Sequence, residues 1–165
     1  MRILAIDLGD QRTGLALADR VTCIASPAGL VEVPIDHDDG NRLIEALSEH
    51  IPAPPSPIEV IMGMPLNMDD TIGPRAKLVK EFAIRLANHT KRPIVLVDER
   101  RTSVAADARM SQTGLTHKQK KKRRDAIAAA AIAEAFLGDP ESIIETINPS
   151  SGPSGTQQSR GSSVE

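Results

Sequence analysis

Several acidic side chains stand at comparable points of the sequence, each at the end of an apolar run or at the start of a helix. They are Asp7, which follows residues 3–6, Asp98 and Glu99, which follow residues 94–97, and Asp125, which precedes an alanine-rich segment. An unpaired carboxylate at the end of a buried strand is costly to desolvate. If these ends lie side by side, the like charges repel, and a cation between them is needed to stabilise the arrangement.

Carboxylate oxygens with no His or Cys cluster nearby favour Mg²⁺ or Mn²⁺ over zinc. The reaction that suits such a site best is phosphodiester hydrolysis with one or two metal ions, which activate water and stabilise the leaving oxygen. Each acid also has an ordinary structural interpretation, which its local sequence leaves open. Asp7 can cap a turn, segment 98–100 can be an ion-paired strand end, and Asp125 can lie in the first turn of a helix.

A strongly basic run precedes Asp125, because six of the seven residues 118–124 are Lys or Arg. Residues 71–125 carry 15 Lys/Arg and 5 Asp/Glu, whereas residues 1–70 carry 4 and 12, although the formal net charge of the chain is only −2. This asymmetry indicates a local surface that faces anions. The run is either a solvated loop or a phosphate-binding surface, to which Lys121, Lys122, Arg123 and Arg124 would contribute.

The composition limits the classes of function. The chain has no Trp or Tyr and only 2 Phe, which argues against recognition of nucleic acids by base stacking and favours salt-sensitive contacts to phosphates. No apolar run approaches the roughly 20 residues of a membrane span. The single cysteine, Cys23, excludes an intrachain disulfide, indicates the cytoplasm and is expected in the core.

The elements that must position the acids follow from hydrophobic periodicity. Strands are expected over residues 3–6, 15–18, part of 21–33, 58–62 and 94–97, and helices over 41–51, 73–87, 105–110 and 126–137. This order predicts an α/β domain with an antiparallel meander followed by parallel crossovers. The domain is expected to cover residues 1–140, and the Ser/Gly/Pro/Gln-rich residues 148–165 to form a disordered tail.

Four segments, in this order and spacing, resemble the YqgF family of Holliday junction resolvase-like proteins, also described as pre-16S rRNA processing nucleases. They are residues 6–9 with Arg12, Gly14 and 18–19; residues 63–67; residues 97–100 with Thr102 and Ala105; and residues 122–125 with 129–130. Together the segments span about residues 2–138. Three positions depart from the residues usual in the family, with Gln11 in place of Lys, Asp70 in place of Gly and Arg101 in place of an apolar residue.

The resemblance implies a ribonuclease H-like α/β fold with a five-stranded mixed sheet, of which the first three strands are antiparallel, flanked by helices. It implies a metal-dependent nuclease site carried by Asp7, Glu99 and Asp125. Because adjacent strand residues point to opposite faces, we expect Glu99 rather than Asp98 to face the metal. Side chains expected to grip substrate phosphate or to order the carboxylates are Arg12, Asn67 and Arg100.

Three functions remain open on the sequence. The first is a cytoplasmic Mg²⁺- or Mn²⁺-dependent nuclease that processes the 5′ end of precursor 16S rRNA, associates with ribosomal or pre-ribosomal particles and is a monomer or a homodimer. The second is a resolvase of branched DNA, which must be a dimer to cut a four-way junction symmetrically. The third is a non-catalytic nucleic-acid-binding or transcription-associated module, which would have no need of acids that repel phosphate.

Overall fold

The structure is a computed structural model that describes residues 1–100 and 117–150, with the side chains of residues 117–122 left out. The helix expected over residues 105–110 and the tail beyond residue 150 lie outside the described residues. The same holds for the side chains of Lys121 and Lys122.

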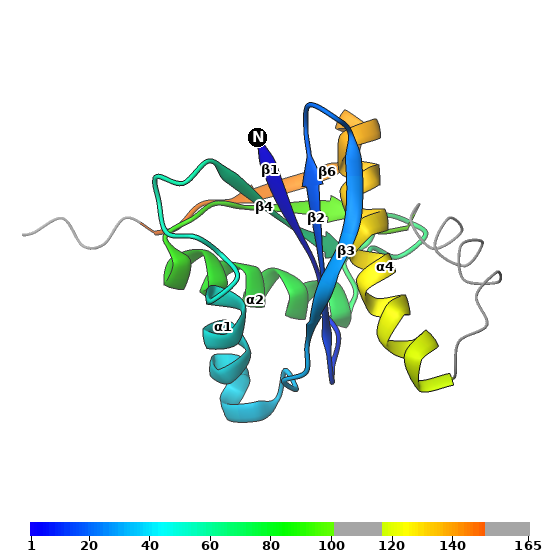
Figure 1. Cartoon of the computed structure of the whole chain (residues 1–165). Helices are drawn as coiled ribbons and strands as arrows, with labels where there is room; N and C mark the ends of the chain where they lie inside the picture. The colour runs from blue at the N-terminus through cyan, green and yellow to red at the C-terminus, as the bar shows by residue number, and fades with distance from the viewer. Residues whose placement is uncertain (101–116, 151–165) are drawn as a thin grey trace, which may run out of the picture.

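A six-stranded mixed sheet forms the centre of the fold, in the order β3-β2-β1-β4-β5-β6 (Figure 1). Its strands are β1 (Arg2–Asp7), β2 (Thr13–Asp19), β3 (Ile24–Val31), β4 (Ile58–Met64), β5 (Ile94–Asp98) and β6 (Ile143–Ile147). The first three strands are antiparallel neighbours, β1, β4 and β5 are parallel, and β6 is antiparallel to β5. The carboxyl ends of β1, β4 and β5 therefore share one edge of the sheet, where sites are commonly built in α/β folds.

The predicted α/β class, the antiparallel meander and the parallel crossovers are confirmed, whereas the expectation of five strands is wrong. The sixth strand, β6, follows the last helix and pairs along the outer edge of β5. Its sequence, IIETI, is rich in β-branched residues, but it is short and only Ile147 is buried. An edge strand with one buried side chain has no clear alternation of polar and apolar residues, so its sequence does not predict a strand.

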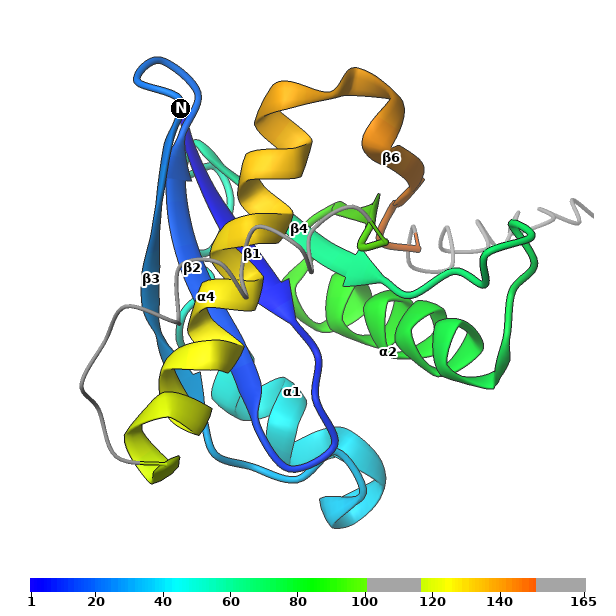
Figure 2. The same cartoon turned by 90° about the vertical axis from the view of Figure 1, so that its right-hand side faces the viewer.

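Helices cover both faces of the sheet (Figure 2). α1 (Asn41–Ser48) and α2 (Pro74–Thr90) pack on one face, and α4 (His117–Gly138) crosses the other over β1, β2 and β3. The last helix begins nine residues before the predicted start at 126, so it includes residues 118–124. The loop interpretation of the basic run is therefore wrong, and these residues belong to the amino-terminal turns of α4. None of the helices among the described residues is long and apolar enough to cross a membrane.

The two faces of the sheet have different cores. On the face of α1 and α2 the core is built from large side chains, which include Ile6, Leu47, Met62, Phe82 and Leu86. On the other face small residues of α4 contact the sheet, and this core includes Ala129, Ala130, Ala133, Ala5 and Ala16. Because alanine side chains are short, α4 approaches the strands closely. The alanine-rich sequence of this helix thus sets the separation between helix and sheet.

Two glycines on the sheet make the approach of α4 still closer. A Cβ added to Gly14 would lie 2.0 Å from the backbone oxygen of Asp125, and one added to Gly63 would lie 2.4 Å from Ile132 Cδ1. The Gly14 contact is between two backbones, which cannot rotate away as a side chain can. It fixes the point at which α4 presents Asp125 to the sheet.

The expectation that Cys23 is a core residue is wrong. Cys23 is exposed in the turn between β2 and β3, where its backbone has φ 54°. The apolar neighbours Val21 and Ile24 suggested a strand interior, but both are themselves exposed.

Gly14→Ala tests the contact between β2 and α4. The added methyl group must push α4 away from the sheet, so we expect the free energy of unfolding to fall by about 2 kcal/mol or more. Urea denaturation measures this loss. Gly138→Ala is the matched control, because a Cβ at Gly138 meets no atom within 4 Å, and its stability should stay within about 0.5 kcal/mol of the parent. Equal stabilities of the two variants would contradict the role given to Gly14.

Candidate active site

Asp7 is the residue around which acidic groups gather at the carboxyl edge of the sheet. It is the last residue of β1 and is partly buried. The pKa of Asp7 is raised to about 7, first by loss of hydration on burial and then by the negative charges of Glu99 and Asp125, while the positive charge of Arg75 opposes this rise. The structure thus brings Asp7, Glu99 and Asp125 together, and we refer to these three residues as the acidic centre.

Glu99 and Asp98 are adjacent in sequence but face different partners. Glu99 follows β5, and its Oε2 would lie 3.1 Å from a Cβ on Gly63, which places the side chain over the end of β4. Burial raises the pKa of Glu99 above its ordinary value, and Asp98 contributes in the same direction, while Arg75 lowers it. Asp98 instead forms an ion pair with Arg100, with 2.7 Å between Oδ2 and Nη2. The structure therefore places Glu99, rather than Asp98, in the acidic centre.

Asp125 enters the acidic centre from α4 and is held there by Arg12. Arg12 Nε lies 3.1 Å from Asp125 Oδ2, and both side chains are largely buried. This ion pair is not aligned as a hydrogen bond, since Arg12 Nε has no hydrogen-bond acceptor among the described residues. Arg12 lies in the loop between β1 and β2, so it links this loop to the helix that carries Asp125. In the free protein Arg12 orders a carboxylate.

Arg75 is a charged neighbour of the acidic centre that the sequence reasoning missed. It is the second residue of α2, and its guanidinium donates to the backbone carbonyl of Leu8 and pairs with the Asp10 carboxylate. Its charge lowers the pKa of both Asp7 and Glu99. A cation in the first turn of a helix is disfavoured by the helix dipole. This misplaced charge, directly after Gly-Pro and a loop at the sheet edge, was a signal that could have identified the residue.

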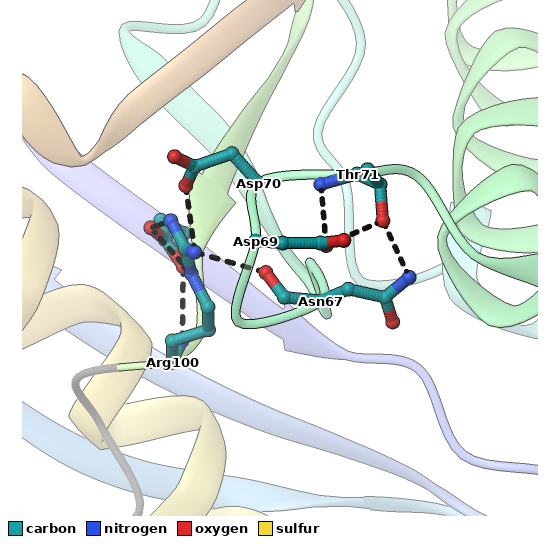
Figure 3. Close-up of polar contacts among 6 residues, drawn as sticks. Asn67, Asp69, Asp70, Thr71 and Arg100 are labelled. Carbon is teal, nitrogen blue, oxygen red and sulfur yellow. Dashed lines mark hydrogen bonds and ion pairs between the residues drawn. The ribbon is translucent and has the colours of Figure 1, made fainter.

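Asn67 and Arg100 lie on the loop after β4 and at the end of β5 (Figure 3). Asn67 Nδ2 donates to Thr71 Oγ1 at 2.9 Å, and the Asn67 carbonyl accepts from Arg100 Nη1 at 3.0 Å. Both side chains thus make contacts within the protein. Arg123 and Arg124 are exposed on α4 just before Asp125, where they can meet a polyanion that approaches the acidic centre.

The acidic centre fits a hard divalent cation, although it is not a complete cage. Among the described residues, no three Asp, Glu, His or Cys side chains are placed close enough together to ligate one ion, and Asp125 is held by Arg12. Mg²⁺ needs only one or two protein carboxylates and completes its shell with water and substrate phosphate. The oxygens of Asp7 and Glu99 provide such a pair, and a cation between them would relieve the repulsion that raises the pKa of Asp7.

The raised pKa of Asp7 predicts an unusual pH dependence of stability in the metal-free protein. Between about pH 4 and pH 7 the folded protein keeps the proton that the unfolded chain has lost, so folding is favoured at the acid end and stability falls as the pH rises. Over this window the loss amounts to about 4 kcal/mol. Asp7→Asn removes it. We therefore expect the variant to be about 2–4 kcal/mol more stable than the parent at pH 8.

Urea denaturation in EDTA at a series of pH values measures this difference. The gain should shrink steadily towards pH 4, at which Asp7 carries its proton in the folded protein. A variant that is less stable than the parent at pH 8 would show that Asp7 is a structural ion-pair partner instead.

Comparison with known proteins agrees with this geometry. The sequence matches the RuvX family, described as Holliday junction resolvase, over residues 1–139. A protein of Lachnospira eligens named "Putative pre-16S rRNA nuclease" is 35% identical over 139 residues, which cover 83% of this chain and 96% of that protein. One of the same name from Anaeromyxobacter sp. strain Fw109-5 is 38% identical over 140 residues, which cover 83% and 96%.

A solved structure supports the same fold. The fowlpox virus resolvase, solved with Holliday junction DNA, matches 83% of this chain and 97% of its own at a TM-score of 0.51 and 12% identity. At that identity the likeness concerns the fold alone. It confirms the ribonuclease H-like α/β fold that the family resemblance implied.

Proposed function

Because the chain belongs to the RuvX family, we propose that it is a nuclease that hydrolyses phosphodiester bonds in structured nucleic acid, and that its substrate is the 5′ end of precursor 16S rRNA. The observation that carries this proposal is the acidic centre, in which the charges of Glu99 at the end of β5 and Asp125 on α4 act on the carboxylate of Asp7 at the end of β1. Relatives named for this rRNA substrate support the choice of RNA. The place of action would be the cytoplasm, with pre-ribosomal particles as partners.

The residues of the acidic centre would bind the metal ion. Asp7 and Glu99 would hold Mg²⁺ or Mn²⁺, and Asp125 would complete the site. When bound, the metal ion activates water and stabilises charge on the phosphodiester oxygens. Arg75 fixes the loop after β1 through the Leu8 carbonyl and so holds the backbone beside Asp7.

The substrate would be held by its phosphates. Four of the described basic side chains are placed for such contacts. Two lie on α4, Arg123 and Arg124, and two lie beside the acidic centre, Arg12 and Arg100. Lys121 and Lys122 belong to the same basic run and are proposed to contribute as well. With 2 Phe and no Trp or Tyr in the chain, base stacking supplies little. We therefore expect the shape of the nucleic acid, rather than base sequence, to direct binding.

Branched DNA is the second candidate substrate, because the family is described by Holliday junction resolution. The two candidate substrates are distinguished by a cleavage assay. The purified chain and Mn²⁺ are incubated with an RNA that contains the 5′ leader of 16S rRNA and, in parallel, with a four-way DNA junction. Cleavage of the RNA alone supports the proposal. Paired cuts in the junction by a dimer favour the resolvase. Binding of either without cleavage favours the non-catalytic alternative.

The division of roles between Glu99 and Asp98 gives a direct test of the metal site. Glu99→Gln removes the negative charge and replaces one of the two carboxylate oxygens by an amide nitrogen, so we expect at least a tenfold loss of Mn²⁺ affinity by calorimetry and a fall in cleavage rate of about 100-fold or more. Asp98→Asn changes the same charge one residue away but faces Arg100, and its Mn²⁺ affinity should stay within about threefold of the parent. The proposal fails if the two variants exchange these behaviours.

The basic surface of α4 predicts a measurable salt dependence. Replacing Arg123 and Arg124 together by Ala should weaken RNA binding. It should also make the plot of log binding constant against log salt concentration less steep, with a slope smaller in magnitude by about two, because each lost phosphate contact removes close to one released counterion. Fluorescence anisotropy at several salt concentrations in EDTA gives the slope. Arg42→Ala, an exposed position on α1 across the sheet, is the control and should leave the slope unchanged. An unchanged slope in the double variant would remove α4 from the interface.

A further inference from the structure

Arg100 is the centre of a polar network that ties the loop after β4 to the end of β5 (Figure 3). Its Nε lies 3.0 and 3.1 Å from the two carboxylate oxygens of Asp98, and its Nη2 lies 2.7 Å from Asp98 Oδ2. Its Nη1 donates to the Asn67 carbonyl at 3.0 Å and pairs with Asp70 Oδ1 at 2.7 Å. One guanidinium thus faces two carboxylates.

The two carboxylate partners of Arg100 differ in how firmly they are held. The Asp98 side chain is 15% exposed, pairs with the guanidinium through both of its oxygens and also accepts a hydrogen bond from the Arg100 backbone. The Asp70 side chain is 81% exposed and meets Arg100 through one nitrogen. Exposed single ion pairs contribute little to stability, whereas two-point pairs away from water persist. Asp98 is therefore the lasting partner, and Asp70 is the one that another anion can replace.

The carboxylate of Asp70 is not needed for the shape of its loop. The Asp70 backbone N–H donates to the Asn67 carbonyl, and the Asn67 N–H donates to the Thr71 carbonyl. The side chain of Asp69 accepts from Thr71, and Asn67 Nδ2 donates to the same residue. Asp70 has φ 64°, a conformation that Asn tolerates as well as Asp does. Asn at position 70 is therefore expected to leave the backbone in place.

The position of this network suggests which anion replaces Asp70. Arg100 follows Glu99 directly, and the Asp70 loop follows β4, so both lie at the edge of the sheet that carries the acidic centre. A nucleic-acid strand with one phosphate at that centre presents further phosphates to its surroundings. The planar guanidinium matches phosphate oxygens as well as it matches a carboxylate.

We propose that Asp70 competes with the nucleic-acid backbone for Arg100: the Asp70 carboxylate occupies the guanidinium in the free protein, and a backbone phosphate replaces it on binding while Asp98 stays. This inference rests on the proposed function and deepens it, because it makes Asp70 a residue that sets the affinity for substrate. A single phosphate gains little by displacing a carboxylate of similar charge. A polyanion held at several other points displaces it readily, so Asp70 favours long strands over mononucleotides.

Asp70→Asn removes the competitor with minimal change of shape. Binding of a fluorescently labelled RNA with the 16S 5′ leader is measured by anisotropy in EDTA, so that no cleavage occurs. We expect the Kd to fall about three- to fivefold. Asp69→Asn is the matched control, since it makes the same change of charge in the same loop but its carboxylate faces Thr71. Its Kd should change by less than about twofold.

The same substitution in an Arg100→Gln background decides whether Arg100 mediates the effect. There Asp70→Asn should no longer tighten binding, and in an Arg100→Lys background, which keeps the charge but loses the planar fork, only part of the gain should remain. Circular dichroism confirms that each variant is folded. Equal gains from Asp69→Asn and Asp70→Asn, a gain that persists in Arg100→Gln, or no binding of RNA by the parent would each overturn the proposal.

These outcomes are distinct from failure of the proposed function. That function fails if Mn²⁺ produces no cleavage of RNA or DNA, a result that binding in EDTA does not influence. A gain specific to Asp70→Asn in a protein that cleaves nothing would leave the competition for Arg100 intact and favour the non-catalytic alternative.

Discussion

The close contact between the backbones of Gly14 and Asp125 is the constraint on which the rest of the site depends. It brings α4 onto the sheet at one fixed point, and it requires a residue without a side chain on β2. With this contact in place, Asp125 lies within electrostatic reach of Asp7, and Arg12 can bridge the loop after β1 to the helix. The small residues along α4 extend the close approach, so the core on this face is thin and positions charged groups at its edge.

The arginines near the acidic centre are paired with acidic side chains. Among the described residues, three arginines near this edge of the sheet each have an acidic partner in the free protein: Arg12 with Asp125, Arg75 with Asp10, and Arg100 with Asp98 and Asp70. The pKa values of Asp7 and Glu99 are raised, since burial and neighbouring negative charges, those of Glu99 and Asp125 on Asp7 and that of Asp98 on Glu99, outweigh the charge of Arg75. The protein thus neutralises its surroundings while it leaves the two central carboxylates in need of a cation.

How far sequence alone predicts this molecule depends on how local each signal is. The buried strands that end at Asp7 and Asp98 have continuous apolar runs, and they were predicted together with the parallel pairing of their ends. β6 was missed because an edge strand buries too little to impose a pattern. The amino-terminal start of α4 was missed because a helix with six like charges is unfavourable by local rules, and its tertiary packing lies further along the sequence. The contacts of Arg75 and Arg100 with partners in distant segments cannot be predicted from a local pattern, even though the position of Arg75 in the first turn of a helix is a local signal.

The three residues of the acidic centre are far apart in the sequence, so they are synthesised at different times. Asp7 is made first, Glu99 follows after most of the sheet, and Asp125 is supplied by the last helix. A nascent chain that has not yet released α4 from the ribosome has no complete acidic centre, however well its first strands have folded. In the proposed nuclease, the three acids would therefore not be assembled until α4 has been synthesised and packed on the sheet.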